Sequence, residues 1–552
     1  MTQSTSGDSG RRKSRKLTIS IVAAIVVIVV IAAVTDVLIS KPPAKTSNTV
    51  YFYTWWGPTS GRALQNLTEA FHKAYPQYTA VPTVSPGAGG TNAKYAILTL
   101  IKAKDPPNTF QTHYGPEMLS YVEAAPGGAS AFVNMTSYVK TTLMNKSVLP
   151  VLEAGTFNGV TFSLPVDAHQ GAQLFFNPQV LAKYGLPIPT NMSMLINDTI
   201  ALGNHGVDAW VIPGGDGGWD QLNLWENAFL AYGGNTMYDQ FMYGTLNISN
   251  PAVMHVLNET NAAFFTFEKY SMPGLESDSW LQTLHYVLDG QAAFYTSGNW
   301  VLEYTTDYLN VLVYPAIAPY TSWTNLTMLD QSFPGTQHYW VLVTDSVAVP
   351  SGPSAKLGLI FAKYFSSYAG DTVFTRTKAV TFYNNVTSDY YATQAQWYSY
   401  KTLLNTSPSD FVYQLSDGGL FDNVFASLTS AMTALSEIGP SDLAAWNLTL
   451  SSAISSEQSQ WMQANSLGYG YMGFPGHPFG GFVPPWATAA ASGASTHTSL
   501  KSQAHISSKS GTSSALFRKP ADVHYVEISL SSVTMLQKFY LMGVDSGFRG
   551  SY

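Results

Sequence analysis

The chain has 552 residues, enough for more than one domain, and a formal net charge of -7 with only 11% charged residues. This weakly acidic balance excludes a protein built around the concentrated basic face that nucleic-acid binding needs. The absence of cysteine excludes disulfides, thiolate nucleophiles and Cys-ligated metals.

The N-terminus predicts a membrane anchor. A basic block at residues 11–16 precedes an apolar run at residues 17–39 that nearly spans a bilayer. Because basic residues stay on the cytoplasmic side, residues 1–16 are expected inside the cell, and everything beyond a short linker at 40–48 is expected outside it. A cleaved signal peptide is the alternative, but no small-x-small cleavage site precedes Asp36, and Lys16-Leu17 lacks the small residue of signals cut before the apolar run.

N-glycosylation sequons agree with an external location, since all of them follow the anchor. They begin at Asn66, Asn134, Asn145, Asn191, Asn197, Asn247, Asn258, Asn325, Asn385, Asn405 and Asn447.

Residues 49–112 alternate between strand and helix patterns. Strands are predicted at 49–55, 78–84 and 109–112, with apolar residues at helical spacing at 63–74 and 92–103 between them. This order predicts an α/β fold with a parallel sheet and right-handed crossovers.

Polar and aromatic residues follow the first and third of these strands. Trp55 and Trp56 come after the first strand, and Gln111 and His113 come at the end of the third. Because ligands bind beyond the carboxyl ends of parallel strands, these four side chains are expected to meet at one edge of the sheet.

The rest of the chain is less regular. Residues 165–300 are richer in helix, with glycine and proline punctuation around 213–218, and 341–349 is predicted to be a strand that returns to the first lobe of the fold. Residues 396–485 mix helix and loop, and 486–552 is predicted to be a tail, rich in Ser, Ala and Thr in its first part.

Enzyme motifs are absent. The chain has no phosphate loop, no His-Glu-x-x-His and no Gly-x-Ser-x-Gly, and its 11 His residues lack ligand spacing, so no catalytic group, cofactor or metal is expected. A glycoside hydrolase remains an alternative, because it needs only two carboxylates across a cleft. The candidates for such a pair are Asp167, Asp216, Asp220, Glu226, Asp289, Asp345 and Asp417.

The composition fits carbohydrate binding better. Aromatic residues make up 13% of the chain, with 33 Tyr and 13 Trp, although most of them are expected in the core. Aromatic rings cover the C–H faces of a sugar, while Asp, Asn, Gln, His and Lys hydrogen-bond its hydroxyl groups.

Several motifs are similar to those of one known family. Trp55-Trp-Gly, a helix ending at Tyr75-Pro76 and Gly89-Gly90 come first, followed by Asp105-Pro-Pro-Asn-Thr-Phe-Gln-Thr-His-Tyr-Gly115. Leu164-Pro-Val-Asp-Ala-His169 and Asp289-Gly-Gln-Ala-Ala-Phe-Tyr-Thr-Ser-Gly-Asn-Trp300 follow. From about residue 49 to about 430, the chain resembles the substrate-binding component of ABC sugar importers, namely the glucose-type extracellular solute-binding proteins in an archaeal-like, membrane-anchored form.

The resemblance implies a periplasmic-binding-protein-like fold of two lobes, with a hinge and a ligand cleft between them. Residues 49–164 and about 343–395 would form lobe 1, and about 165–342 and 396–485 lobe 2. The implied function is to bind an external mono- or short oligosaccharide, glucose-type favoured, and to deliver it to a membrane permease and its ATPase.

The resemblance also implies the sugar contacts. Trp55 and Trp56 would line the cleft, Gln111 and His113 would bond hydroxyl groups, and His169 would approach from the hinge. The remaining expected contacts are the stacking residues Trp280 and Trp300, and the polar residues Asp345, Lys378 and Asp417.

Departures from the family pattern affect the identity of the sugar. Asn299 stands where the family has Asp, Asp417 stands where it usually has His, and its acidic residue near the first turn is missing around Thr59-Ser60. Besides the glycoside hydrolase, a glycosylated structural surface protein remains an alternative function.

Overall fold

The computed structural model describes residues 48–57, 61–85, 90–303, 329–376, 378–391 and 394–487. The predicted anchor, the basic segment before it, the sequon at Asn325 and almost all of the predicted tail lie outside these residues. Among the described helices, none is long and apolar enough to cross a membrane.

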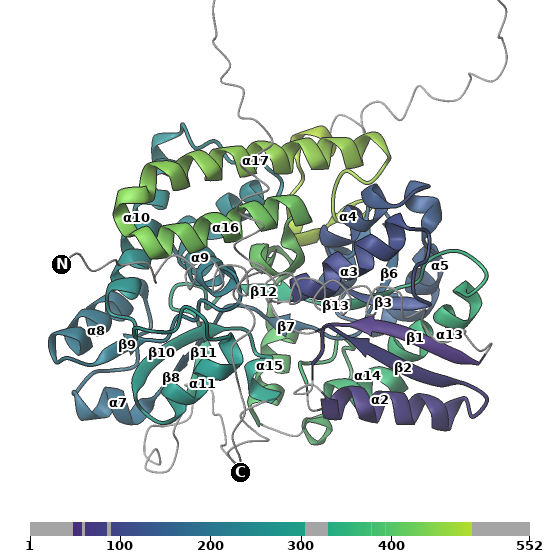
Figure 1. The fold of residues 1–552 in the computed structure, drawn as a ribbon, viewed down its shortest axis with the longest axis horizontal. Helices are drawn as coiled ribbons and strands as arrows, with labels where there is room; N and C mark the ends of the chain where they lie inside the picture. Colours follow the sequence, from purple (N-terminus) through teal and green to yellow (C-terminus); the bar gives the residue numbers. More distant parts are fainter. Residues whose placement is uncertain are drawn as a thin grey trace, which may run out of the picture. The chain divides into compact units, whose positions relative to one another are not determined.

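A five-stranded sheet has the order β2-β1-β3-β13-β6 (Figure 1). Strand β1 pairs in parallel with β2 and β3, as the strand and helix patterns predict, whereas β13 runs antiparallel to β3 and β6. The register sets Asp345 opposite His113. The strands are β1 Thr49–Thr54, β2 Thr79–Val84, β3 Thr109–His113, β6 Ser163–Pro165 and β13 Asp345–Ala348.

Helices cover both faces of this sheet. In Figure 1, α2 and α14 lie on one side of β1 and β2, and α3 and α4 lie on the other. In α2, the buried residues Leu64, Leu67 and Phe71 recur at helical spacing, and the helix ends before Pro76 as predicted. The helices are α2 Gly61–Ala74, α3 Thr91–Lys102, α4 Glu117–Ala124, α13 Ala355–Phe365 and α14 Tyr368–Thr375.

A second, four-stranded sheet has the order β11-β8-β10-β9 and mixes parallel with antiparallel pairs. Its strands are β8 Gln173–Phe176, β9 Asp208–Trp210, β10 Ala292–Ser297 and β11 Leu329–Ser332. The helices that follow in this part are α7 Pro178–Lys183, α8 Met192–Asn204, α9 Trp219–Met242, α10 Pro251–Lys269 and α11 Trp280–Leu288. Helix α9 is interrupted at Gly234, whose φ of 69° is not helical.

A third sheet, of order β14-β12-β7, corrects the prediction of a single strand at 341–349. Strand β12 (Trp340–Val343) pairs with β7 (His169–Gln170) and β14 (Phe411–Tyr413), while β13 joins the first sheet. The chain changes sheets at Thr344, whose carbonyl oxygen accepts a hydrogen bond of 2.7 Å from the Tyr114 N–H. The sequence pattern does not reveal this change, because β12 and β13 are both fully buried and only Thr344 separates them.

The C-terminal part contains α15 Gln394–Asn405, α16 Asp422–Ile438 and α17 Leu443–Ser466. Helices α16 and α17 run along each other (Figure 1) and bury apolar residues such as Leu428 and Leu450. Short elements complete the described residues: α5 Thr136–Tyr138, α6 Leu149–Ala154, β4 Thr156–Phe157, β5 Val160–Thr161, β15 Gly473–Phe474 and β16 His477–Pro478.

Candidate functional site

Gln111, in the middle of β3, joins three parts of the first sheet. Its Oε1 accepts hydrogen bonds from the Thr54 hydroxyl and from the Trp55 N–H at 3.1 Å, and its Nε2 donates to Asp345 Oδ1 at 2.8 Å. The side chain is buried, and both its oxygen and its nitrogen make hydrogen bonds within the protein. These hydrogen bonds hold the Trp55 backbone and the Asp345 carboxyl group in position.

The two adjacent tryptophans have different surroundings. The Trp55 ring is partly buried and its centroid lies 5.0 Å from that of His113. The Trp56 ring packs against Phe374 at 4.6 Å in an aromatic core, with Lys378 Nζ 5.8 Å from its centroid. The Trp56 side chain is therefore buried beside the Lys378 ammonium group, and its expected place in the ligand cleft stays a prediction.

Glu117, at the start of α4, holds His113 in place. Its Oε2 lies 2.7 Å from both His113 Nδ1 and Lys94 Nζ, and its Oε1 accepts from the Thr112 hydroxyl at 2.9 Å. Burial acts to lower the pKa of His113, but Glu117 and Asp417 outweigh it and the pKa is raised. The raised pKa favours the protonated ring, in which Nε2 is a charged donor; this atom lies 3.3 Å from Asp417 Oδ1 and 4.0 Å from Asp345 Oδ1.

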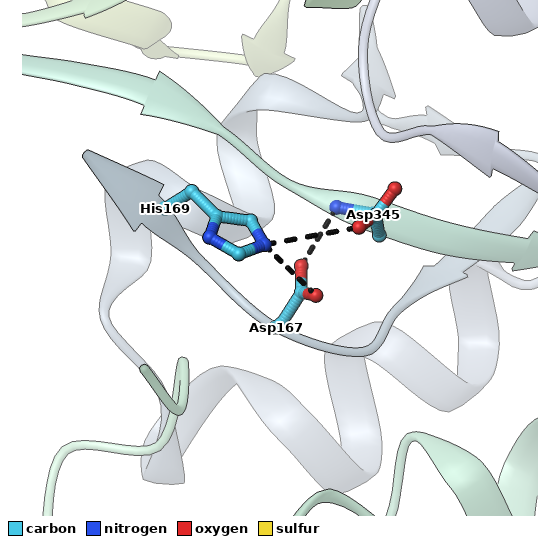
Figure 2. Close-up of side chains that lie close together, drawn as sticks. All are labelled: Asp167, His169 and Asp345. Carbon is cyan, nitrogen blue, oxygen red and sulfur yellow. Dashed lines mark hydrogen bonds and ion pairs between the residues drawn. The ribbon is translucent and has the colours of Figure 1, made fainter. Parts of the chain in front are cut away.

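Figure 2 shows Asp167, His169 and Asp345 close together. His169 Nε2 lies 3.4 Å from Asp167 Oδ2 and 3.8 Å from Asp345 Oδ2, and the Asp345 N–H donates to Asp167 Oδ1 at 2.8 Å. The other ring nitrogen, Nδ1, lies 2.8 Å from Asn299 Oδ1, which orients the imidazole. Asn299, the departure from the family motif, is therefore a partner of His169.

The two carboxyl groups, of Asp167 and Asp345, have pKa values shifted in opposite directions. Burial, and after it Asp167, raises the pKa of Asp345 to about 6. Burial also acts to raise the pKa of Asp167, but His169 and Lys378 outweigh it and the pKa is lowered. Asp167, which the sequence suggested only as a hydrolase carboxylate, is thus the ionised partner of this group.

Asp167, His169 and Asp345 each offer a ligand atom within 4.8 Å of the others, a spacing that suits a metal ion. However, Lys378 lies near enough to lower the pKa of both carboxyl groups. An ammonium group therefore already supplies positive charge there, and the arrangement fits hydrogen bonding to hydroxyl groups better than metal coordination.

Trp300 brings an aromatic ring to this group from the end of β10. Its centroid lies 5.5 Å from that of His169, at 77°, and 5.8 Å from that of Trp219. A Cβ at Gly298 would clash with the Trp300 ring, which explains the glycine there. Trp219 was not predicted; the only signal was the glycine-rich stretch at 213–218 before it.

Asp417 lies in a turn, Leu415–Gly419, that Glu226 fixes from α9. Glu226 Oε2 accepts the N–H groups of Leu415 at 2.8 Å and Ser416 at 3.1 Å. Burial raises the pKa of Glu226 to about 7, and burial also raises the pKa of Asp417. The turn needs Gly418, which has φ of 89° and no room for a Cβ beside His113.

Trp280 begins α11, and its N–H donates to Asp216 Oδ2 at 2.7 Å. This contact is made by the backbone, and the Trp280 side chain is partly buried.

A separate cavity of about 320 Å³ lies between α9, α10 and α16, and none of the predicted site residues lines it. Its lining includes Gln221, Glu268, Ser436 and Glu437.

The chain belongs to the family of bacterial extracellular solute-binding proteins, whose model matches residues 55–352. Members of this family are substrate-binding proteins of ABC transporters and not enzymes, which confirms the resemblance drawn from the motifs and argues against the glycoside hydrolase alternative.

One relative is "Glucose-binding protein GlcS" of Saccharolobus solfataricus, 48% identical over 495 residues, or 89% of this chain and 87% of that protein. Solved structures share the mixed α/β fold at low identity. A protein from a study of xylan utilisation by Caldanaerobius polysaccharolyticus has a TM-score of 0.58 at 16% identity, covering 75% of this chain and 99% of its own. A chitin oligosaccharide binding protein has a TM-score of 0.58 at 16% identity, covering 76% and 99%.

Proposed function

We propose that this chain binds a neutral sugar outside the cell, with glucose or a closely related monosaccharide favoured, and delivers it to the permease of an ABC importer. The name of the relative from Saccharolobus solfataricus supports glucose as the ligand. In this function the chain itself breaks no bond. The ATPase of the importer supplies the energy for transport.

The observation that carries the proposal is the convergence on Asp345. Its carboxylate accepts a hydrogen bond from Gln111 and lies within 4.0 Å of His113 and His169. Each histidine ring in turn lies beside a tryptophan ring, His113 beside Trp55 and His169 beside Trp300. Aromatic faces beside charged hydrogen-bonding tips are what a pyranose requires.

The proposal includes a fold of two lobes, with one of the larger sheets in each. In this proposal the first sheet belongs to lobe 1 (49–164 and about 343–395), and the β8–β10 sheet belongs to lobe 2 (about 165–342 and 396–485). A ligand that bridges both lobes binds the closed form better and shifts the population toward it. Trp280 would then contribute to the cleft from lobe 2.

An external, membrane-anchored location completes the proposal. An anchor at 17–39 would keep the protein near its permease and raise its effective concentration there. Among the sequon asparagines in the described residues, Asn66 and Asn447 are half-buried, and the others are exposed and accessible to a glycan: Asn134, Asn145, Asn191, Asn197, Asn247, Asn258, Asn385 and Asn405.

Titration calorimetry of the full chain against a panel of sugars, amino acids and peptides tests the function. We expect saturable binding of a sugar without turnover. Replacing Asp345 by Ala removes a charged hydrogen-bond acceptor worth about 1.5–3 kcal/mol, so affinity should fall roughly 10- to 150-fold. Trp300→Ala should also weaken binding strongly, whereas Asp289→Ala, an exposed change in the same motif, should not.

Binding of an amino acid or peptide, with none to any sugar, would contradict the specificity. Unchanged affinity in both the Asp345 and the Trp300 variants would contradict the site.

A further inference from the structure

The cavity between α9, α10 and α16 is a second hollow, apart from the residues proposed to bind sugar. Its volume of about 320 Å³ reaches the lower end of the range for small-molecule sites. Glu268, Glu276 and Glu437 line it, whereas none of the described lining residues is Lys, Arg or His. The cavity therefore carries carboxyl groups with no basic side chain in its lining.

Glu268, on α10, is the most buried of these three acids. Glu276 and Glu437 are exposed, whereas Glu268 is half-buried, and its Oε1 accepts a hydrogen bond from the Ser436 hydroxyl at 2.8 Å. An ionised carboxylate offers about four acceptor positions, so Glu268 can take further donors beside Ser436. Burial raises the pKa of Glu268 to about 7, so the group is mostly ionised at about pH 8.

Gln221, on α9, lines the same cavity and supplies a second, independent observation. Its side chain is 5% exposed, and its Oε1 has no hydrogen-bond partner in the described part of the chain. Nearly all buried polar atoms in native proteins have a partner. A donor bound in the cavity would supply the hydrogen bond that this oxygen lacks.

The lining favours an organic cation over a metal ion. Among the described residues, the only group of acids and histidines spaced closely enough to share a metal ion is the one that contains Asp167, and it lies elsewhere. Apolar side chains, those of Ile212, Met272 and Leu275, also line the cavity and suit an alkyl chain. An ammonium group has three donors and no acceptor, which matches a carboxylate and an amide oxygen.

We infer that this cavity is a second ligand site that binds a small aliphatic amine in its ammonium form. Glu268 and the Gln221 oxygen bind the ammonium group, and Met272 and Leu275 contact the alkyl chain. The site is separate from the sugar site, so it adds a ligand class that the proposed function does not include.

Calorimetry of the full chain with 1,5-diaminopentane, in an amine-free buffer at about pH 8, tests this inference. We expect saturable binding with a dissociation constant below about 1 mM. The neutral analogue 1,5-pentanediol, of the same length, should bind about tenfold more weakly or not at all, because it lacks the charge.

Three variants locate the site. Glu268→Gln keeps an acceptor for Ser436 but removes the charge, and affinity for the diamine should fall about tenfold or more. Gln221→Leu removes the amide at similar volume, and affinity should fall about fivefold. Glu259→Gln removes the same charge from an exposed position of α10 outside the cavity, so it should change affinity less than twofold.

Thermal unfolding of each variant separates a lost contact from a lost fold, and Glu268→Gln and Gln221→Leu need not both fold for the test to stand. No saturable binding of the diamine would mean that water alone fills the cavity, and it would overturn the inference. Equal binding of the diol, or equal losses in the Glu268 and Glu259 variants, would overturn it as well. None of these results depends on whether the chain binds a sugar.

Discussion

Glu117→Gln should destabilise the protein strongly, because Glu117 is the counter-ion of a buried lysine. Lys94 is 5% exposed, and its Nζ lies 2.7 Å from Glu117 Oε2. The pKa of Glu117 is lowered: burial acts to raise it, but Lys94 and His113 outweigh burial. The amide of a glutamine would turn N–H groups toward the Lys94 ammonium group, which is itself only a donor.

The size of the effect follows from the uncompensated charge. Removing one partner of a buried ion pair costs about 3–5 kcal/mol. Asp422 and Asp417 also attract Lys94, so we expect a loss near the lower end, about 3 kcal/mol. The hydrogen bonds from Thr112 and from the His113 N–H can be kept by the glutamine oxygen.

Urea unfolding followed by tryptophan fluorescence measures this loss. Glu69→Gln, on the exposed side of α2, is the matched control and should change stability by less than about 0.5 kcal/mol. The double variant Lys94→Met with Glu117→Gln removes both charges and should recover most of the loss. Two results would contradict this reasoning: a loss below about 1 kcal/mol in the single variant, or no recovery in the double variant. Either would show that Glu117 is not the group that neutralises the buried charge of Lys94.

Two further predictions concern the ligand. Because burial and Asp167 raise the pKa of Asp345 to about 6, sugar affinity measured by calorimetry should fall roughly tenfold from pH 7 to pH 5, and Asp345→Asn should abolish this pH dependence. The sign for stability is opposite: a raised pKa means that the stabilisation due to protonated Asp345 is complete below its unfolded-state pKa and is lost as pH rises through about 6. Gly298→Ala forces the Trp300 ring to move, so affinity should fall about tenfold while the unfolding midpoint shifts only modestly; unchanged affinity would count against Trp300 as a sugar contact.

Much of the first sheet could be predicted from the sequence. Strand and helix periodicities are local, and they predicted β1, α2, β2, α3 and β3 to within a few residues. The rule for parallel strands then brought Trp55, Gln111 and His113 to one edge, where the structure has them in contact.

Long-range partners could not be predicted in the same way. Gln111 and Asp345 are 234 positions apart, and their hydrogen bond exists because β13 pairs with β3. Glu117 belongs to no motif, and its importance comes from the buried Lys94 and His113 beside it. Trp55 and Trp56 look equivalent in the sequence. The packing of Phe374, from α14, against Trp56 is what buries the Trp56 ring more deeply than that of Trp55.

The sequence by itself determines the order of the helices and strands in the first sheet and the family motifs, because both depend on residues that are close together along the chain. It also determines how many aromatic and polar side chains are present. Which of those side chains share a charge or a hydrogen bond, and which remain buried without a partner, depends on how distant strands and helices pack together. That packing joins Asp345 to His113 and His169, and no local pattern along the chain encodes it.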